Sequence, residues 1–245
     1  MSAPPGSGAR LVLATRNAHK VAELRAILAD EIASVASADV VELELAVVGL
    51  DAYEAPEVAE TGTTYADNAL LKARAAAELT GLPAVADDSG LSVDVLGGAP
   101  GVFSARWAGR HGDDRANLDL LLGQLGDVPD EHRSARFVCA IALVHPGSSG
   151  GRAEDRSPRE YVEHGELTGR LERKPRGTGG FGYDPILRPD GSTRTLAELD
   201  PSEKNAISHR SQALRAMAPR LLEVLKAVGP VAGTTTEPAT HPPTA

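Results

Sequence analysis

The sequence predicts an α/β fold built around a mixed sheet. Three observations lead to this prediction. Segments whose apolar residues recur with helical spacing alternate with short apolar runs between residues 10 and 228, as in folds that layer helices on a sheet. The first apolar run leads through a polar loop into a helix, and two later runs are joined by a polar, turn-rich stretch typical of a hairpin.

The first predicted strand is LVLA at residues 11–14, followed by the polar segment TRNAHK at 15–20. A helix is expected next, because four apolar residues fall on one face: Val21, Leu24, Ile27 and Leu28. The N–H groups at a helix start favour an anion, and Lys20 adds a positive charge. Residues 15–20 are therefore a candidate phosphate loop, with a simple helix cap as the alternative.

The segment at residues 32–60 is expected to contain one strand or two.

The second helix is predicted at residues 64–79. Thr64 is followed three positions later by Asp67, in the manner of a capping box. Gly81 and Pro83 should end this helix, since glycine favours the position after a helix and proline cannot continue one.

A short buried strand is expected at 84–87 and a half-buried strand at 91–95, before the turn GGAPG. Asp113 or Asp114 should then cap a third helix. The apolar face of that helix carries Leu118, Leu121, Leu122 and Leu125.

The longest strand is predicted at residues 135–144 and another at 161–171. The polar stretch at 146–160 between them is expected to be a mobile hairpin loop. A final helix should run from about residue 208 to residue 228, and Pro219 should kink or split it.

Residues 1–9 and 229–245 are rich in Pro, Gly, Thr and Ala, and we expect both tails to be disordered. With 245 residues, of which 42% are hydrophobic, the chain can bury a core as a single domain at 10–228. Cys139 lies in the apolar run RFVCAIALV and is expected to be a small buried residue rather than a reactive thiol.

The net charge of −9 would repel nucleic acid and anionic membranes, so neither is an expected partner. Aromatic residues make up only 3% of the chain, too few for the stacking platforms of single-strand binders. We find no signal-peptide pattern and no apolar run of membrane-spanning length. The expected location is the cytoplasm.

The segment RGTGGFGYD contains a G-x-G-x-x-G pattern at Gly177, Gly179 and Gly182. A dinucleotide-binding fingerprint needs a strand before it and a helix after it, and this context provides neither. The segment is therefore predicted to be a flexible glycine-rich loop that carries Phe181 as a lid or stacking ring, with a plain turn as the alternative.

Three cations, Lys204, His209 and Arg210, stand just before or in the first turn of the last helix. Cations at that end oppose the helix dipole, so their placement calls for a reason. An anionic ligand would supply one, and a solvated basic edge is the alternative.

Two adjacent aspartates, Asp87 and Asp88, stand where an apolar run ends. They form either a solvated acidic turn or part of a Mg²⁺ site, because Mg²⁺ prefers a few oxygen ligands shared with substrate phosphates. Neighbouring side chains on a strand point to opposite faces, so we expect one aspartate to act and the other to support it. Glu60, at the approach to the second helix, is a candidate second ligand.

Five segments in order resemble the inosine and xanthosine triphosphate pyrophosphatase family: ATRNAHKVAEL, ETGTTYADNALLKA, PAVADDSGLSVDVLGGAPGVFSAR, GTGGFGYDPI and EKNAISHR. The resemblance implies a long curved mixed sheet flanked by helices, in two lobes with a nucleotide cleft between them. It also implies a homodimer that hydrolyses deaminated purine nucleoside triphosphates (dITP, ITP and XTP). Arg16 departs from the family pattern, in which glycine is common at that position.

The resemblance also implies roles for individual residues. Glu60 and Asp88 would be the Mg²⁺ ligands, and Asp88 would be the general base. The triphosphate loop would consist of Thr15, Arg16, Asn17, Ala18, His19 and Lys20. The remaining substrate-binding residues would be Ser89, Phe181, Gly182, Tyr183, Asp184, Lys204, His209 and Arg210.

The residue types suit this chemistry. Hydrolysis between the α- and β-phosphates needs a positioned water, a base that takes its proton, and cations that offset the charge of the leaving pyrophosphate. Two other hypotheses remain open: a nucleotide-binding protein without catalysis, and a phosphomonoesterase with an aspartyl nucleophile.

Overall fold

The computed structural model describes residues 11–15, 21–22, 24–27, 47–147 and 157–227. Within these residues, six strands form one sheet in the order β2-β1-β3-β4-β5-β6. β1 runs parallel to β2 and β3, and the other neighbouring pairs are antiparallel. The predicted mixed sheet is confirmed. The strands are β1 (Leu11–Leu13), β2 (Val47–Gly49), β3 (Ala84–Val93), β4 (Ser134–His145), β5 (Arg159–Leu171) and β6 (Leu187–Pro189).

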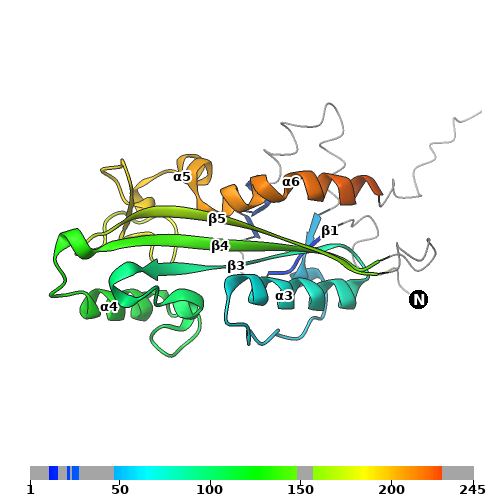
Figure 1. Ribbon diagram of the computed structural model, residues 1–245, viewed down its shortest axis with the longest axis horizontal. Helices are drawn as coiled ribbons and strands as arrows, with labels where there is room; N and C mark the ends of the chain where they lie inside the picture. The colour runs from blue at the N-terminus through cyan, green and yellow to red at the C-terminus, as the bar shows by residue number, and fades with distance from the viewer. Residues whose placement is uncertain (1–10, 16–20, 23, 28–46, 148–156, 228–245) are drawn as a thin grey trace, which may run out of the picture.

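Helices cover both faces of the sheet. In Figure 1 the long strands β3, β4 and β5 run side by side, with α3 (Tyr65–Thr80) and α4 (Asp114–Gln124) below them. The helices α5 (Pro201–Ile207) and α6 (His209–Ala227) lie above. No helix in the described part of the chain has the length and apolar character to cross a membrane.

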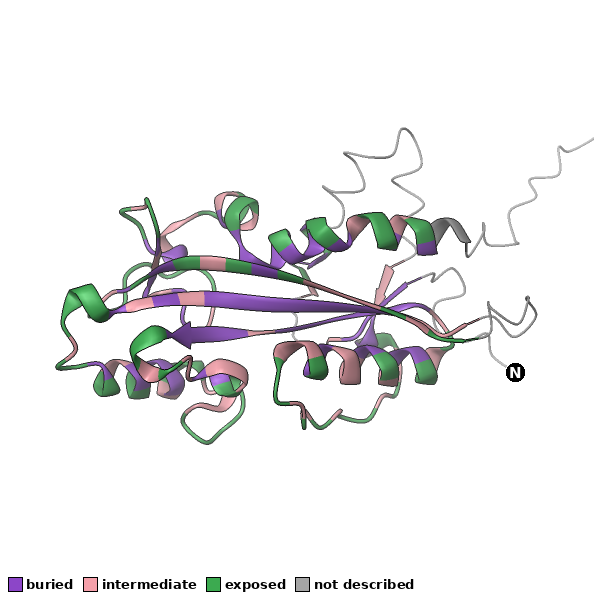
Figure 2. Ribbon diagram, in the orientation of Figure 1, coloured by how far each residue is buried: buried purple, intermediate pink, exposed green. Residues whose placement is uncertain are grey.

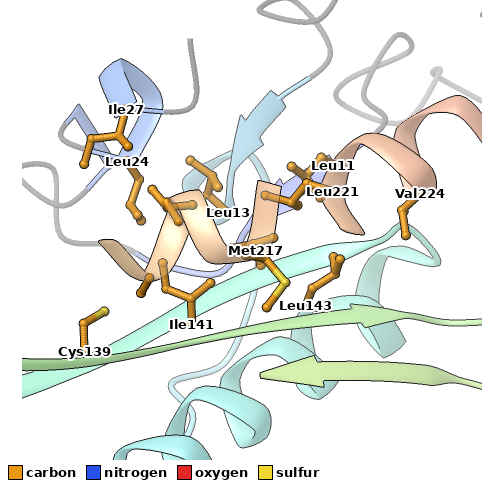
Figure 3. Close-up of a cluster of buried hydrophobic side chains, with 13 residues drawn as sticks. Leu11, Leu13, Leu24, Ile27, Cys139, Ile141, Leu143, Met217, Leu221 and Val224 are labelled. Atoms are coloured by element: carbon orange, nitrogen blue, oxygen red, sulfur yellow. The ribbon is translucent and has the colours of Figure 1, made fainter. Parts of the chain in front are cut away.

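The described residues form three hydrophobic clusters, and alternation along the first half of β3 separates two of them. Ala84 and Ala86 of β3 pack with the alanine face of α3, whereas Val85 packs with the apolar face of α6. Figure 3 shows Met217 and Leu221 of α6 directed toward the strands. Figure 2 shows the same division as buried residues along β3 and β4 and on the sheet-facing sides of the helices. A side chain's position in β3 therefore decides which helix it meets.

The predicted second helix is confirmed as α3. The Thr64 side chain accepts a hydrogen bond from the Asp67 N–H at 3.1 Å, so Thr64 is the N-cap. Gly81 ends the helix in the left-handed conformation, with φ of 68°. The third predicted helix is confirmed as α4, and Asp113 rather than Asp114 is its N-cap.

The prediction of two strands at 84–87 and 91–95 is wrong, because β3 is continuous from Ala84 to Val93. Every residue in that range pairs with β4, with Asp88 opposite Ala140. The polar residues stay in the strand because each carboxylate forms an ion pair with a flanking helix: Asp87 with Arg210 of α6 and Asp88 with Lys72 of α3. Val95 lies beyond β3 and is 48% exposed.

The predicted last helix also needs correction. A separate short helix, α5, contains Lys204, and the extended residue Ser208 separates it from α6. The helix α6 is not split at Pro219 and continues to Ala227. Pro219 lies on the exposed side of α6, while Met217 and Leu221 on either side of it are buried against the sheet. The parts of α6 before and after Pro219 therefore pack on the same face of the sheet.

The hairpin between the two longest strands is confirmed, since β4 and β5 are antiparallel neighbours. Cys139 is buried in β4, as expected. In the first predicted helix, residues 21–22 and 24–27 are helical, and Leu24 and Ile27 are buried.

Several predictions lie outside the described residues: the structure of Leu28, of segment 148–156 in the predicted hairpin loop, and of the tails 1–9 and 229–245. The predicted loop 146–160 is too long at its end, because Arg159 and Glu160 belong to β5 and pair with β4. The mobility of this loop and the domain boundaries at 10 and 228 stay predictions.

Candidate active site

A cavity of about 680 Å³ lies beside the middle of β3. It gathers side chains from segments far apart in the sequence, which β3, α3, η3 (Gly101–Arg106), α6 and the glycine-rich loop bring together. The residues predicted from the sequence that line it are Thr15, Glu60, Asp87, Asp88, Ser89, Phe181, Gly182, Tyr183, Asp184, His209 and Arg210. Residues 16–20 lie outside the described part of the chain.

Two of the predicted carboxylates converge on one ammonium group. Lys72 Nζ lies 2.9 Å from Asp88 Oδ1 and 3.0 Å from Glu60 Oε1. The other Glu60 oxygen accepts from Arg106 Nη1 at 3.1 Å. Burial lowers the pKa of Lys72, but the negative charges of Asp88, Asp87 and Glu60 outweigh burial and raise that pKa above its ordinary value. Lys72 therefore remains charged at neutral pH.

Asn68 connects the Glu60 segment to Asp88. Its Oδ1 accepts from the Gly62 N–H at 2.8 Å, and its Nδ2 donates to Asp88 Oδ2 at 3.3 Å. Asn68 and Lys72 are four residues apart in α3, so both side chains leave the helix on the same face. A side chain at position 62 would meet Asp67 and Asn68 at 2.5 and 2.7 Å, which explains the glycine there.

Asp87 points to the opposite face of β3. Its Oδ2 accepts from Arg210 Nε at 3.2 Å, and Arg210 Nη2 donates to Ser89 Oγ at 2.8 Å. The side chains of Arg210 and Asp87 are only 4% and 0% exposed. The two aspartates therefore contact different helices: Asp88 faces α3 and Asp87 faces α6.

The glycine-rich loop is fixed on several sides. Asp184 Oδ2 accepts both from the Phe181 N–H and from Lys204 Nζ, each at 2.9 Å. Lys204 Nζ also lies 5.0 Å from the centre of the Phe181 ring, and Arg210 Cζ lies 5.3 Å from it, within the range of cation–π attraction. The loop leads through a turn into β6 rather than directly into a helix, in agreement with the rejection of a dinucleotide fingerprint.

Two further contacts tie this loop to the other side of the cavity. The Gly182 N–H donates to Asp114 Oδ2 at 3.0 Å, and the Tyr183 hydroxyl donates to the Ser104 carbonyl at 2.9 Å. Burial raises the pKa of Tyr183, so its hydroxyl remains a donor at neutral pH. Gly182 adopts φ of 60°, a conformation in which glycine is favoured.

His209, in the first turn of α6, is 3% exposed and stacks on Phe137 of β4 with ring centres 4.9 Å apart. The stacked ring lies in the wall of the cavity. Lys204, in contrast, is not among the residues that line the cavity and reaches the site through Asp184 and Phe181.

Among the site residues that were not predicted from the sequence, Asn68, Lys72, Arg106 and Asp114 make polar contacts with predicted ones. Asn68 and Lys72 carry a usable signal, because they are polar residues four apart on a helix whose neighbouring stripe of alanines is buried. Arg106 and Asp114 carry none, since their roles depend on contacts with residues distant in the sequence.

The residues present fit a magnesium ion. The oxygens of Glu60 and Asp88 reach the same ammonium, so both carboxylates border one small volume. The described residues contain no group of three or more His, Cys, Asp or Glu side chains placed to hold a metal without other ligands. Mg²⁺ is typically held in this way, by one or two carboxylates with water and substrate phosphates completing its coordination.

The comparisons with known proteins agree on one family. The family model described as "Ham1 family" matches residues 11–220. The dITP/XTP pyrophosphatase of Streptomyces coelicolor is 60% identical over 217 residues, which cover 88% of this chain and 98% of that protein. The dITP/XTP pyrophosphatase of Nocardia farcinica is 54% identical over 213 residues, covering 87% of this chain and 95% of its own.

Solved structures are similar over the same length. The structure of a HAM1 protein from Coxiella burnetii has a TM-score of 0.70 and 41% identity, covering 88% of this chain and 99% of that chain. The structure of a nucleoside-triphosphatase / dITP/XTP pyrophosphatase from Mycobacterium abscessus has a TM-score of 0.63 and 49% identity. The match covers 85% of this chain and 98% of that chain.

Proposed function

The chain belongs to the Ham1 family, and from this premise we propose that it hydrolyses dITP, ITP and XTP to the nucleoside monophosphate and pyrophosphate. The observation that carries the proposal is the convergence of Glu60 and Asp88 on Lys72 within the cavity. A phosphate-cleaving site needs this combination: a carboxylate that can take a proton, and fixed positive charge beside it.

Asp88 is the general base. Its carboxylate lines the cavity, Asn68 fixes one oxygen, and Lys72 binds the other. The Asp88 carboxylate takes a proton from the attacking water as that water's oxygen bonds to the α-phosphorus, and the bond from this phosphorus to the pyrophosphate oxygen breaks. The positive charge of Lys72 offsets the negative charge of this carboxylate.

Glu60 and Asp88 would hold Mg²⁺, and the bound ion would offset the negative charge of the substrate phosphates and lower the pKa of a bound water. Around these carboxylates, Lys72 and Arg106 already neutralise part of the negative charge. The anionic substrate therefore meets a nearly balanced site rather than a strongly acidic one.

The segment from Thr15 to Lys20 binds the triphosphate. Support comes from the position of Thr15 in the cavity wall, directly after β1. The N–H groups of a loop that enters a helix, and the charge of Lys20, suit phosphate oxygens.

The base binds on the opposite side of β3, between Arg210 and the glycine-rich loop. Inosine and xanthosine carry an acceptor at position 6, where adenosine carries an amino donor. Donors from Arg210 and His209 would face that amino group if adenine entered. At a site formed to hydrogen-bond one substrate, such a mismatch lowers kcat/KM for the wrong substrate by a factor of ~10⁴ or more. A role for the Phe181 ring in covering the base is supported by its position in the cavity wall, 5.3 Å from Arg210 Cζ.

A homodimer is part of the same proposal, supported by the family to which the chain belongs. Sedimentation equilibrium of the full chain measures it directly: a mass of twice 25.5 kDa agrees, and a monomer at micromolar concentration contradicts it.

The experiment that tests the function is a product assay with dITP, XTP, dATP and dGTP in the presence of Mg²⁺. Monophosphate and pyrophosphate from dITP and XTP, with little from dATP, support the proposal. Unchanged dITP with measurable binding would indicate a nucleotide-binding protein without catalysis. Release of orthophosphate from monophosphates would indicate an aspartyl phosphomonoesterase.

A further inference from the structure

The two adjacent aspartates of β3 serve opposite sides of the sheet. Asp88 lies on the α3 face, with Lys72 Nζ at 2.9 Å. Asp87 lies on the α6 face, with Arg210 Nε at 3.2 Å. Both nevertheless line the same cavity. The strand passes along the cavity, so each face contributes a different set of charges to it.

Arg210 is held from the β3 side by two residues of one face. Asp87 Oδ2 accepts from Nε, and Ser89 Oγ accepts from Nη2 at 2.8 Å. The Ser89 hydroxyl in turn donates to Asp87 Oδ2 at 3.3 Å. Because Asp87 and Ser89 are two residues apart in a strand, their side chains point the same way and bind different edges of one guanidinium.

These contacts fix the plane of the guanidinium. Arginine is a long side chain with several rotatable bonds, and a planar group bound along two edges loses that freedom before any ligand arrives. Arg210 Cζ also lies 5.3 Å from the centre of the Phe181 ring. The orientation of Arg210 is therefore set between a rigid strand and the glycine-rich loop.

We propose that Asp87 is a positioning residue that determines base selectivity. It acts by holding the guanidinium of Arg210 in the orientation that contacts the purine. The proposal rests on the proposed function of the site. Asp88 then governs the rate of hydrolysis on one face of β3, while Asp87 governs which base is accepted on the other.

A purely structural ion pair would contribute to folding alone. A positioning role makes a different prediction, because the substitution Asp87→Asn keeps the shape and removes the charge that orients Arg210. Binding of the base should weaken, whereas binding of pyrophosphate, which has no base, should not.

The test uses isothermal titration calorimetry on the full chain with Mg²⁺, with inosine monophosphate, adenosine monophosphate and pyrophosphate as probes. In Asp87→Asn we expect the affinity for inosine monophosphate to fall about tenfold or more, as for a lost hydrogen bond to a charged group. The preference over adenosine monophosphate should fall with it. The affinity for pyrophosphate should change less than about twofold, and kcat for dITP should stay within about threefold while KM rises. Unchanged affinity and unchanged preference would overturn the proposal.

A double-mutant cycle tests whether Asp87 acts through Arg210. In the Arg210→Gln background, adding Asp87→Asn should leave the affinity for inosine monophosphate unchanged. A further loss as large as in the wild-type background would overturn the proposal. The comparison of Arg210→Gln with the double variant does not need Asp87→Asn alone, and in Arg210→Gln the Ser89 hydroxyl still donates to Asp87. If Asp87→Asn alone unfolds, equal affinities of these two variants for inosine monophosphate support the proposal, and a tenfold weaker affinity in the double variant overturns it.

The failure of the proposed function has a different signature. If the wild-type chain does not convert dITP, the hydrolytic assignment of Asp88 fails. The Asp87 proposal is decided separately, by whether the binding measurements show Arg210-dependent loss of base affinity.

Discussion

Asp88 Oδ1 and Lys72 Nζ lie 2.9 Å apart, and the same ammonium reaches Glu60. The helix α3 thus places its charge between two carboxylates that come from a strand and a loop. In this arrangement the ammonium offsets part of the cost of burying the two carboxylates.

Replacing Lys72 by methionine should destabilise the protein and reveal how the carboxylates bind a cation. Loss of one partner from a buried ion pair costs about 3–5 kcal/mol, since Asp88 and Glu60 would repel each other. Added Mg²⁺ should then raise the Tm of Lys72→Met more than that of the wild type, as measured by differential scanning calorimetry. An equal response to Mg²⁺ in both proteins would show that the two carboxylates do not share a cation.

The bond between Asp114 and the Gly182 N–H should control the glycine-rich loop. We expect Asp114→Ala to raise KM for dITP about three- to tenfold, the value of one hydrogen bond, because the loop loses its contact with α4. Asp114→Asn should have a smaller effect, since its amide oxygen can still accept.

Asp113 provides the matched control for Asp114. It caps α4 through the Ala116 N–H and, within the described part of the chain, makes no hydrogen bond or ion pair with the loop. Asp113→Ala should lower the free energy of unfolding by about 1 kcal/mol and leave KM unchanged. Equal KM values for the Asp113→Ala and Asp114→Ala variants would rule out the specific role of Asp114.

Alkaline pH should destabilise the protein partly through Tyr65, at the start of α3. Burial raises the pKa of Tyr65 to about 12, whereas tyrosine in an unfolded chain ionises near pH 10. Between these values the unfolded state releases a proton that the folded state keeps, so stability present below pH 10 is lost as pH rises. The loss is roughly 2–3 kcal/mol.

The variant Tyr65→Phe measures this contribution. Urea unfolding at pH 8 and at pH 11.5 should show a smaller loss of stability in Tyr65→Phe than in the wild type. Parallel losses in the two proteins would mean that the Tyr65 hydroxyl titrates as in an unfolded chain.

The sequence predicts the mixed sheet, α3, α4 and the hairpin because each depends on local signals: a cap, a glycine, or a periodic run of apolar residues. It does not predict the continuity of β3, because Asp87, Asp88 and Ser89 interrupt the apolar run. Those polar residues stay in the strand through contacts with Lys72 and Arg210, which come from distant segments.

The same distinction applies to the site. Glu60 and Asp88 are recognisable from the sequence, because the segments that carry them resemble a known family. Lys72 shows a spacing signal in α3, but Arg106 and Asp114 show none, because their contacts with Glu60 and Gly182 depend on how distant elements pack. Residues whose roles arise only from packing between elements cannot be found from spacing along the chain.

In the proposed reaction, Asp88 activates water for cleavage between the first and second phosphates. The direct test of this role is a side-by-side assay of wild type and Asp88→Asn on dITP with Mg²⁺, with products followed by ³¹P NMR. Asp119→Asn, at an exposed position of α4, serves as the control. We expect deoxyinosine monophosphate and pyrophosphate from the wild type and the control. In Asp88→Asn, kcat should fall at least ~10²-fold without loss of the folded state. Undiminished turnover in Asp88→Asn, or orthophosphate and the diphosphate as products of the wild type, would contradict this claim.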